Sequence, residues 1–242
     1  ADEHGAFTME KHALHIWPRK QYMMIALPNM DGSFTCTLFF PFEGDPSFAS
    51  LQSDDEIMSF FTEQFPDALS MMPTLLEDYK KNPVSSLVTV RAFPWAYKDK
   101  VLLMGDSAHA IVPFFGQGMN AGFEDCRVFD EMLAAHSSDD WTSLFHAYEL
   151  ARKPNGDAIA ELALNNFIEM RDLVADPEFL RRKKAERMLS DMFPDAFHTA
   201  YSMVTFNHMP YSEALRRGKL NESIIDSMLE IPGILESDPE SH

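Results

Sequence analysis

The sequence has few cysteines and few basic residues. Its two cysteines, Cys36 and Cys126, are too isolated for a disulfide framework or a zinc site, which is typical of a reducing intracellular setting. The 242-residue chain has 20 Lys and Arg residues against 38 Asp and Glu residues, which gives a formal net charge of -18. Nucleic acids and anionic membranes are bound through clustered basic side chains. The charge balance therefore argues against both kinds of partner.

Long apolar runs are lacking too. No stretch approaches the roughly 18 apolar residues of a transmembrane helix, and the N-terminal ADEHGAF has neither the basic nor the apolar region of a secretory signal. We therefore expect a soluble, cytoplasmic protein without a membrane anchor. The one basic cluster, residues 181–184, lies among acidic residues and is interpreted as a solvent-exposed helix face.

Three segments near the N-terminus have the composition of strands, being rich in β-branched, aromatic and Met residues: 14–18, 22–28 and 34–41. Asp31-Gly32 separates the second from the third and predicts a hairpin. Side chains alternate along a strand, which gives shared faces: Met23, Ile25 and Leu27 in one segment, and Thr35, Thr37 and Phe39 in the next. We expect both faces to be largely covered, with a core on one side and a second layer or a ligand on the other.

The rest of the chain is mostly helical in pattern. Ser53 and Glu56 have capping-box spacing and predict a helix that runs to residue 65. Further helices are predicted over 67–81, 119–136, 141–151, 157–174, 177–192, 212–217 and 222–229. Pro154-Asn155-Gly156 predicts a break, strand character returns over 86–93 and 100–104, and 198–206 reads as extended or irregular.

One stretch, residues 100–126, changes abruptly from strand-like to loop-like to helix-like chemistry. Gly105-Asp106 ends an apolar run, and a loop with Pro113, Gly116 and Gly118 leads into a helix. An apolar stripe runs along that helix: Met119, Phe123, Cys126, Phe129 and Leu133. A carboxylate at a strand end accepts bonds from hydroxyl groups, and a helix N-terminus favours an electron-rich group. The stretch therefore predicts a site for a polyhydroxylated or anionic small molecule.

Other polar residues of this stretch receive plainer interpretations. Ser107 and His109 lie two residues apart in a loop, without a nucleophile elbow or an acid partner, so they do not indicate a hydrolase. Glu124 and Asp125 are interpreted as side chains that complement the helix dipole. We assign no metal site and no general base.

The segment GDSAHAIVPFFGQGMNAGFEDC resembles the second flavin-binding motif of the class A aromatic hydroxylases, the para-hydroxybenzoate hydroxylase group, and within it the kynurenine 3-monooxygenases. The resemblance implies FAD as cofactor and NADPH as co-substrate. It implies a set of cofactor-binding residues: Asp106, Pro113, Gly116, Gln117, Gly118, Met119 and Asn120. Asp106 is implied to bind the ribityl or nearby hydroxyls, and the amides at the helix start are implied to face the flavin N1-C2 carbonyl region.

Two later motifs are similar to substrate-binding elements of the same family. The run NNFIEMR implies that Asn166 contacts the amino acid end of the substrate, and YSMVTF implies that Tyr201 binds its carboxylate. The hairpin resembles the substrate-domain sheet, which implies an aromatic pocket: Met23, Ile25, Leu27, Thr37 and Phe39, with Pro113 and Phe114 from the loop. From the residues alone, a solvated or internally satisfied amide at position 166 and plain core packing of the hairpin residues stay open as alternatives.

The implied activity is hydroxylation of L-kynurenine to 3-hydroxykynurenine with O2, through a flavin C4a-hydroperoxide. Two alternatives stay open: a related hydroxylase of another aromatic acid, and a truncated, non-catalytic binding protein. The expected fold is α+β (α/β), with a substrate-domain sheet and helices over 1–98, an FAD-binding segment over 99–136 and a helical region over 137–242.

A Gly-x-Gly-x-x-Gly motif, which opens the family's N-terminal Rossmann βαβ unit, does not occur among the ten glycines. We therefore expect the chain to be the C-terminal part of the enzyme, with the N-terminal FAD-binding half as its partner. Alone, it is expected to be inactive and to hold flavin weakly or not at all.

Overall fold

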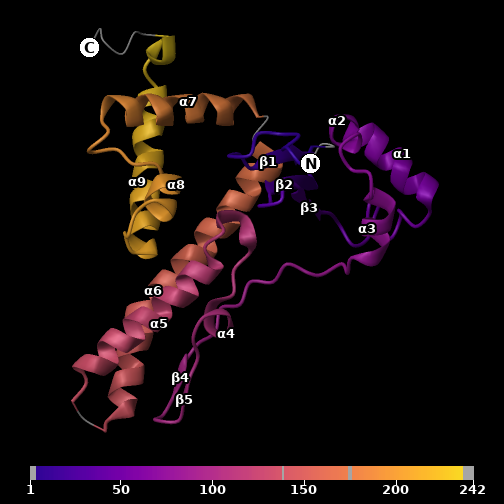
Figure 1. Cartoon of the computed structure of the whole chain (residues 1–242). Coiled ribbons are helices and arrows are strands. Elements are labelled where there is room, and N and C mark those ends of the chain that lie inside the picture. Colours follow the sequence, from indigo (N-terminus) through magenta and orange to yellow (C-terminus); the bar gives the residue numbers. More distant parts are fainter. Residues whose placement is uncertain (1–3, 138, 174–175, 237–242) are drawn as a thin grey trace. The chain divides into compact units, whose positions relative to one another are not determined.

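The computed structural model describes residues 4–137, 139–173 and 176–236, which form two compact units (Figure 1). The described residues up to Ser86, together with 168–173, make up the first unit. Residues 87–167 and the described residues from Asp176 onward make up the second. The mixture of helices and sheet agrees with the expected α+β class.

A three-stranded antiparallel sheet forms the centre of the first unit: β1 (His15–Pro18), β2 (Met23–Pro28) and β3 (Phe34–Phe39). The predicted hairpin is confirmed, and its turn contains Gly32 at φ +85°, which a glycine adopts without strain. The register pairs Met23 with Phe39 and Ile25 with Thr37, so the predicted face is also confirmed.

Helices α1 (Asp54–Gln64), α2 (Pro66–Leu69) and α3 (Leu75–Lys81) follow the sheet in this unit. An aromatic-rich core joins them to the sheet: Tyr22, Met24, Leu51, Ile57, Phe60, Phe61, Phe65, Ala68 and Leu75. The predicted single helix over 67–81 is wrong, because the chain turns between α2 and α3. Pro73 explains the turn, since its ring disfavours helical backbone at the residue before it. A π-helical turn, η2 (Glu169–Leu173), also belongs to this unit.

The second unit begins with short elements: β4 (Ala96–Tyr97), β5 (Val101–Leu102), α4 (Asp106–His109) and the 3-10 turn η1 (Pro113–Phe115). Longer helices follow: α5 (Gly118–Ala135), α6 (Trp141–Ile168), α7 (Pro177–Met192), α8 (Ala200–Thr205) and α9 (Tyr211–Leu229), with the 3-10 turn η3 (Ile234–Glu236). Residues 86–93 do not form the predicted strand. Two backbone bonds, from Val90 to Ala110 and from Ala92 to Ala108, hold that segment beside α4.

The predicted helix break at Pro154 is wrong, because α6 runs through it. A proline inside a helix costs about 3 kcal/mol. Packing on both sides offsets that cost, since Arg152 and Ile159 are buried. The Asn155 amide also donates to the Ala151 carbonyl at 3.1 Å and accepts from the backbone and hydroxyl of Ser212. Tertiary contacts therefore outweigh the local signal.

Two further expectations near the C-terminus are wrong for similar reasons. Residues 200–205 form a helix, α8, whose Thr199 side chain caps it by accepting from the Ser202 amide at 3.1 Å. The two short helices expected over 212–229 are one helix, α9. Gly218 lets α9 approach Ala200, and Asn221 donates to the His198 carbonyl at 2.7 Å, so contacts with α8 support the middle of α9. Within the described residues, no helix is both long and apolar enough to span a bilayer.

The predicted capping box at the start of α1 is confirmed. Ser53 accepts from the Glu56 amide at 3.3 Å, and Glu56 accepts from the Ser53 amide at 2.8 Å. We expect Ser53→Ala to lower the free energy of unfolding of the first unit by about 1 kcal/mol, measured by urea titration with Trp17 fluorescence. Ser70→Ala is the matched control, since the Ser70 hydroxyl makes one long, 3.5 Å contact. Equal losses in the two variants would show that the cap is not responsible.

Candidate flavin site

The seven predicted cofactor residues lie on one continuous stretch between the end of β5 and the first turn of α5. Gly105 has φ +56° and Gly116 has φ +65°, so both glycines occupy backbone that other residues rarely adopt. Asp106 starts α4 and is exposed, as are Gly116, Met119 and Asn120. These exposed groups are accessible to a ligand.

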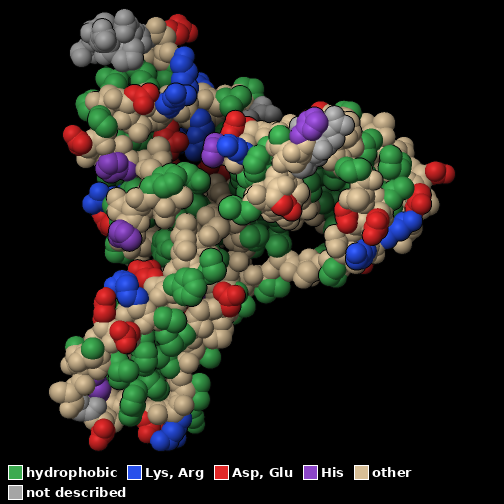
Figure 2. All heavy atoms as spheres, viewed as in Figure 1, with side chains coloured by type: hydrophobic (Ala, Val, Ile, Leu, Met, Phe, Trp, Pro, Cys, Tyr) green, Lys and Arg blue, Asp and Glu red, His purple; other side chains and the backbone are tan. Residues whose placement is uncertain are grey.

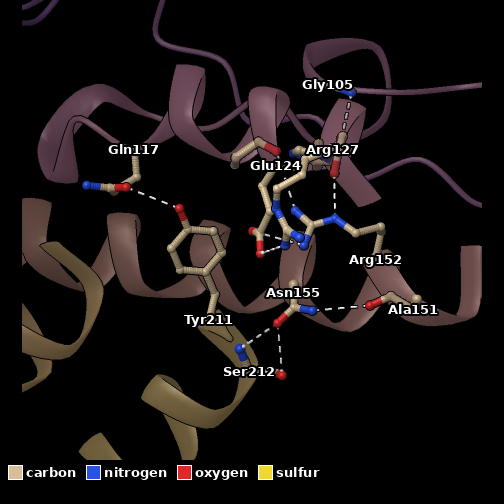
Figure 3. Close-up of polar contacts among 12 residues, drawn as sticks. Gly105, Gln117, Glu124, Arg127, Ala151, Arg152, Asn155, Tyr211 and Ser212 are labelled. Carbon is tan, nitrogen blue, oxygen red and sulfur yellow. Dashed lines mark hydrogen bonds and ion pairs between the residues drawn. The ribbon is translucent and has the colours of Figure 1, made fainter. Parts of the chain in front are cut away.

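Gln117 differs from its neighbours because it is buried and already engaged. Its side-chain oxygen accepts from the Tyr211 hydroxyl at 3.1 Å (Figure 3). The same oxygen accepts from the Asn120 side-chain amide at 3.0 Å. These contacts anchor the start of α5 to α9. The Gln117 side chain therefore supports the loop, whatever its backbone contacts.

The start of α5 fits an electron-rich group. The backbone amides of Gly118, Met119 and Asn120 are in the first turn, where a helix offers them no internal acceptor, and the first helical bond runs from the Ala121 amide to the Gln117 carbonyl. The helix spans 18 residues, so its dipole adds positive potential there. These amides can donate to the carbonyl edge of a flavin, and the exposed Asp106 carboxylate of the same stretch can accept from its hydroxyls.

Two predicted substrate residues of the second unit meet directly. The Asn166 side chain donates to the Phe114 carbonyl at 2.7 Å, and the Phe114 ring stacks on Phe167 with 4.4 Å between centroids. Tyr201 is 54% exposed and stacks on Phe115 at 5.9 Å. Aromatic rings from η1, α6 and α8 thus gather beside the predicted cofactor stretch, with Pro113 exposed next to them.

The remaining predicted substrate residues lie on the sheet of the first unit. Met23 is fully buried, Ile25 and Phe39 are half-buried, and Leu27 and Thr37 are exposed. Complete burial of Met23 is what plain core packing requires. A pocket role for this face stays a prediction.

Beneath the cofactor stretch lies a buried ionic cluster that the sequence did not predict. Asp125 of α5 is 0% exposed. It accepts from the Gly105 amide at 2.8 Å, from His109 Nε2 at 2.6 Å and from Arg152 Nε at 2.7 Å. Arg152 also meets Glu124 Oε2 at 2.9 Å, and Figure 3 shows its guanidinium reaching from α6 to α5.

Charge stabilises this cluster in spite of burial. Burial opposes ionisation of Asp125, but the bonds from His109, Arg152 and Gly105 outweigh it and hold the pKa of the carboxyl below its usual value. Burial likewise opposes the charge of Arg152, yet Asp125 and Glu124 raise its pKa. Burial and the neighbouring Asp125 raise the pKa of Tyr148. Asp125 and Arg152 are therefore a charged pair.

The orientation of α5 is opposite to what its apolar pattern indicates. Met119 is 71% exposed and Phe123 is 65% exposed, and Cys126 and Leu133 are exposed as well, whereas Asp125 faces inward. Phe129 is the exception in the predicted stripe, since it is half-buried against Tyr148. The inward face shows a weaker signal in the sequence: Ala121, Val128 and Met132 flank Asp125 at helical spacing. Arg152 and His109 lie far from Asp125 in the sequence, so their pairing leaves no local pattern.

A second buried carboxylate, Glu149, supports the segment before β4. It accepts from the backbone amides of Trp95 and of Ala96, the latter at 3.2 Å. Trp95 is buried with its ring 5.3 Å from that of His109. An open groove elsewhere in the unit has mixed charge, being lined by Arg91, Lys153, Asp157 and Glu161 among others, and contains none of the predicted site residues. Across the described residues, no group of three His, Cys, Asp or Glu side chains is arranged to hold a metal ion.

Comparisons with known proteins agree with the motif analysis. Residues 71–163 match the family model described as "FAD binding domain", a range that includes all seven predicted cofactor residues and the Asp125 cluster. The chain is 52% identical over 234 residues to a kynurenine 3-monooxygenase of Flavobacterium psychrophilum, covering 97% of this chain and 52% of that protein.

Proteins of the same name from other organisms match over similar spans. That of Christiangramia forsetii is 50% identical over 98% of this chain and 53% of its own length, and that of Dictyostelium discoideum is 48% identical over 92% of this chain and 51% of its own length. The chain thus spans about half the length of the curated relatives it matches. The resemblance to this group of flavin hydroxylases is confirmed.

The depressed pKa of Asp125 predicts a pH-dependent stability. A carboxyl with a lowered pKa in the folded state stabilises the fold above its unfolded pKa, near 4, and loses that contribution as the pH falls toward the folded value. We expect Asp125→Asn to lower the free energy of unfolding by about 3 kcal/mol at pH 7, and the difference from wild type to shrink at pH 3.

The free energies of unfolding at pH 7 and pH 3 are measured by urea titration followed by Trp95 fluorescence. Trp17 and Trp141 are replaced by Phe in all proteins compared, so that Trp95 is the sole tryptophan. The matched control is Asp130→Asn, an exposed aspartate of the same helix, expected to change stability by less than about 0.5 kcal/mol. A difference between Asp125→Asn and wild type that does not depend on pH would contradict the assignment.

Proposed function

We propose that the chain forms the part of an FAD-dependent, NADPH-using aromatic monooxygenase that holds the flavin ring and the substrate, L-kynurenine, during hydroxylation with O2. The observation that carries the proposal is the stretch from Gly105 to Asn120, with its exposed carboxylate and free helix amides, inside the segment that matches the FAD binding domain family. The names of the relatives support the substrate. The acidic charge and the two free cysteines support a cytoplasmic location.

The chain's own groups divide the flavin between them. Asp106 accepts hydrogen bonds from the ribityl or nearby hydroxyls, and the amides of Gly118, Met119 and Asn120 face the N1-C2 carbonyl edge. The positive end of α5 favours negative charge at that edge by about 0.3–1 kcal/mol. FAD supplies the redox chemistry and the activation of oxygen.

The aromatic residues beside this stretch serve the substrate. Asn166 and Tyr201 bind the amino acid group and its carboxylate, while Pro113 and Phe114 border the aromatic ring and exclude water. The bond from Asn166 to the Phe114 carbonyl supports this arrangement, because it ties the amide to the backbone of the loop that follows Asp106.

We also propose a polypeptide partner: the part of the relatives that this chain does not match, which includes the pyrophosphate-binding half. The outward apolar stripe of α5, formed by Met119, Phe123, Cys126 and Leu133, supports it, and Figure 2 shows hydrophobic side chains gathered over α5 and α6. Within the described residues β5 pairs only with β4, which leaves one edge of an apolar strand open. A second copy of this chain is disfavoured as the partner, because each copy has a formal net charge of -18 and the two would repel one another.

Co-expression with the unmatched half of the Flavobacterium psychrophilum relative tests the activity. The complex is expected to retain FAD, seen as flavin absorbance, and to oxidise NADPH faster when L-kynurenine is added. Asn166→Ala and Tyr201→Phe should each raise the kynurenine concentration for half-maximal stimulation about tenfold. The matched control is Asn165→Ala, at the neighbouring exposed amide. It should leave the kynurenine concentration for half-maximal stimulation unchanged.

Each failure has a separate meaning in that experiment. A complex that holds FAD but does not respond to kynurenine would sink the substrate assignment and favour a hydroxylase of another aromatic acid. A complex that forms without retaining FAD would refute the cofactor site.

Cys126 reports on the proposed interface, because it is exposed within the apolar stripe. In a Cys36→Ser background it is the sole thiol, and its reaction with a thiol reagent should slow about tenfold or more when the unmatched half is bound. Phe123→Asp should prevent co-purification, whereas Leu180→Asp, at an exposed position of α7, should not. Protection of Cys126 in the chain alone with a doubled mass would show that a second copy covers the stripe.

A further inference from the structure

We infer that Asp125 is a positioning residue: through the Gly105 amide it fixes the turn that presents Asp106 to the flavin. The inference rests on the proposed role of Asp106 in binding FAD. Asp125 Oδ2 accepts from the Gly105 amide at 2.8 Å, and Asp106 is the next residue along the chain. Asp106 itself is exposed and takes no part in the buried cluster.

The turn lies directly against α5. A Cβ added at Gly105 would meet the Gly122 Cα at 3.9 Å, and one added at Gly122 would meet the Gly105 Cα at 3.8 Å. Gly122 lies one helical turn before Asp125, so both residues share the face of α5 beneath the turn. Two contacts therefore hold Gly105: the backbone of Gly122 and the carboxylate of Asp125.

The carboxylate is well placed to fix the turn because it cannot rotate. His109 Nε2 donates to the same oxygen as Gly105, at 2.6 Å, and Arg152 Nε donates to the other oxygen at 2.7 Å. The approach of His109 depends on Gly156 of α6, since a Cβ there would lie 3.2 Å from three side-chain atoms of His109, its Cβ, Cγ and Cδ2. Donors from α4 and α6 thus set the position of the oxygen that the Gly105 amide meets.

The backbone of Gly105 needs such an anchor. It has φ +56° and ψ -140°, and glycine pays the largest conformational entropy when it is ordered. On the other side of the turn, the Ser107 hydroxyl donates to the Met104 carbonyl at 2.7 Å and accepts from its amide at 3.2 Å. Those contacts bracket Gly105 without touching its amide, so Asp125 is its hydrogen-bond partner in the structure.

Hydrogen exchange at the Gly105 amide, measured by NMR on the 242-residue chain without flavin, tests the anchor. In Asp125→Asn the charged Arg152 keeps the remaining oxygen, so the new NH2 group faces the Gly105 amide and the bond is lost. Exchange at Gly105 should accelerate about tenfold or more, while exchange at the buried Ile159 amide reports global opening. Glu149→Gln is the matched control, and it should accelerate Trp95 without affecting Gly105.

If Gly105 in Asp125→Asn accelerates only as much as Ile159, Asp125 has a general structural role and the inference is overturned. If Asp125→Asn fails to fold, Gly105→Ala is used in its place. It strains the turn at positive φ while leaving the buried pair in place. Gly233→Ala, at φ +74° with open space around it, controls for the strain alone.

The link to the ligand is tested in the co-expressed complex by the dissociation constant for FAD, from flavin fluorescence. Asp125→Asn, or Gly105→Ala, should weaken FAD binding about tenfold. The effect should vanish in an Asp106→Ala background, because a positioning residue acts through the group it positions. Gly233→Ala should leave the dissociation constant unchanged.

The outcomes separate the inference from the proposed function. Additive effects of Asp125→Asn and Asp106→Ala, or unchanged FAD binding in Asp125→Asn, would overturn the inference and leave the FAD site standing. A wild-type complex that binds no FAD would refute the proposed function, and with it the presentation of Asp106 to flavin.

Discussion

The buried pair of Asp125 and Arg152 is the constraint on which the second unit depends. Burying two charges is favourable only where they are paired and the remaining hydrogen-bonding positions are filled. Here Gly105, His109 and Glu124 fill them, and each comes from a defined place on α4, its preceding turn or α5. Satisfying the charges thus aligns α5 with α6 and fixes the turn before α4 in a single arrangement.

The same constraint explains why α5 exposes its apolar stripe. Turning Asp125 outward would bury Met119 and Phe123, but it would leave the Arg152 charge buried without its main partner. Breaking a buried pair costs about 3–5 kcal/mol, whereas exposing two large apolar side chains costs about 1.5–3 kcal/mol for each. The two terms are close, so the polypeptide partner proposed above would remove the cost of exposing the stripe and would make the observed orientation favourable on both faces.

Local interactions were predictable from the sequence, and long-range ones were not. The capping box of Ser53 and Glu56 and the hairpin at Gly32 are encoded within a few residues, and both are confirmed. Pro154 misleads for the opposite reason. Its local effect is to end a helix, but Arg152 and Asn155 on either side make contacts with residues distant in sequence that keep α6 intact.

The candidate site divides in the same way. The residues proposed to face the flavin, such as Asp106 and Gly116, lie on one continuous stretch of the chain, so a contiguous motif predicts them. Their supports are scattered through the chain, since a loop is held in place by whatever packs beneath it. Asp106 can be exposed and yet fixed because Asp125, on a different element, holds the residue before it, and an exposed carboxylate without that support would have to be ordered by the ligand itself at a cost in affinity.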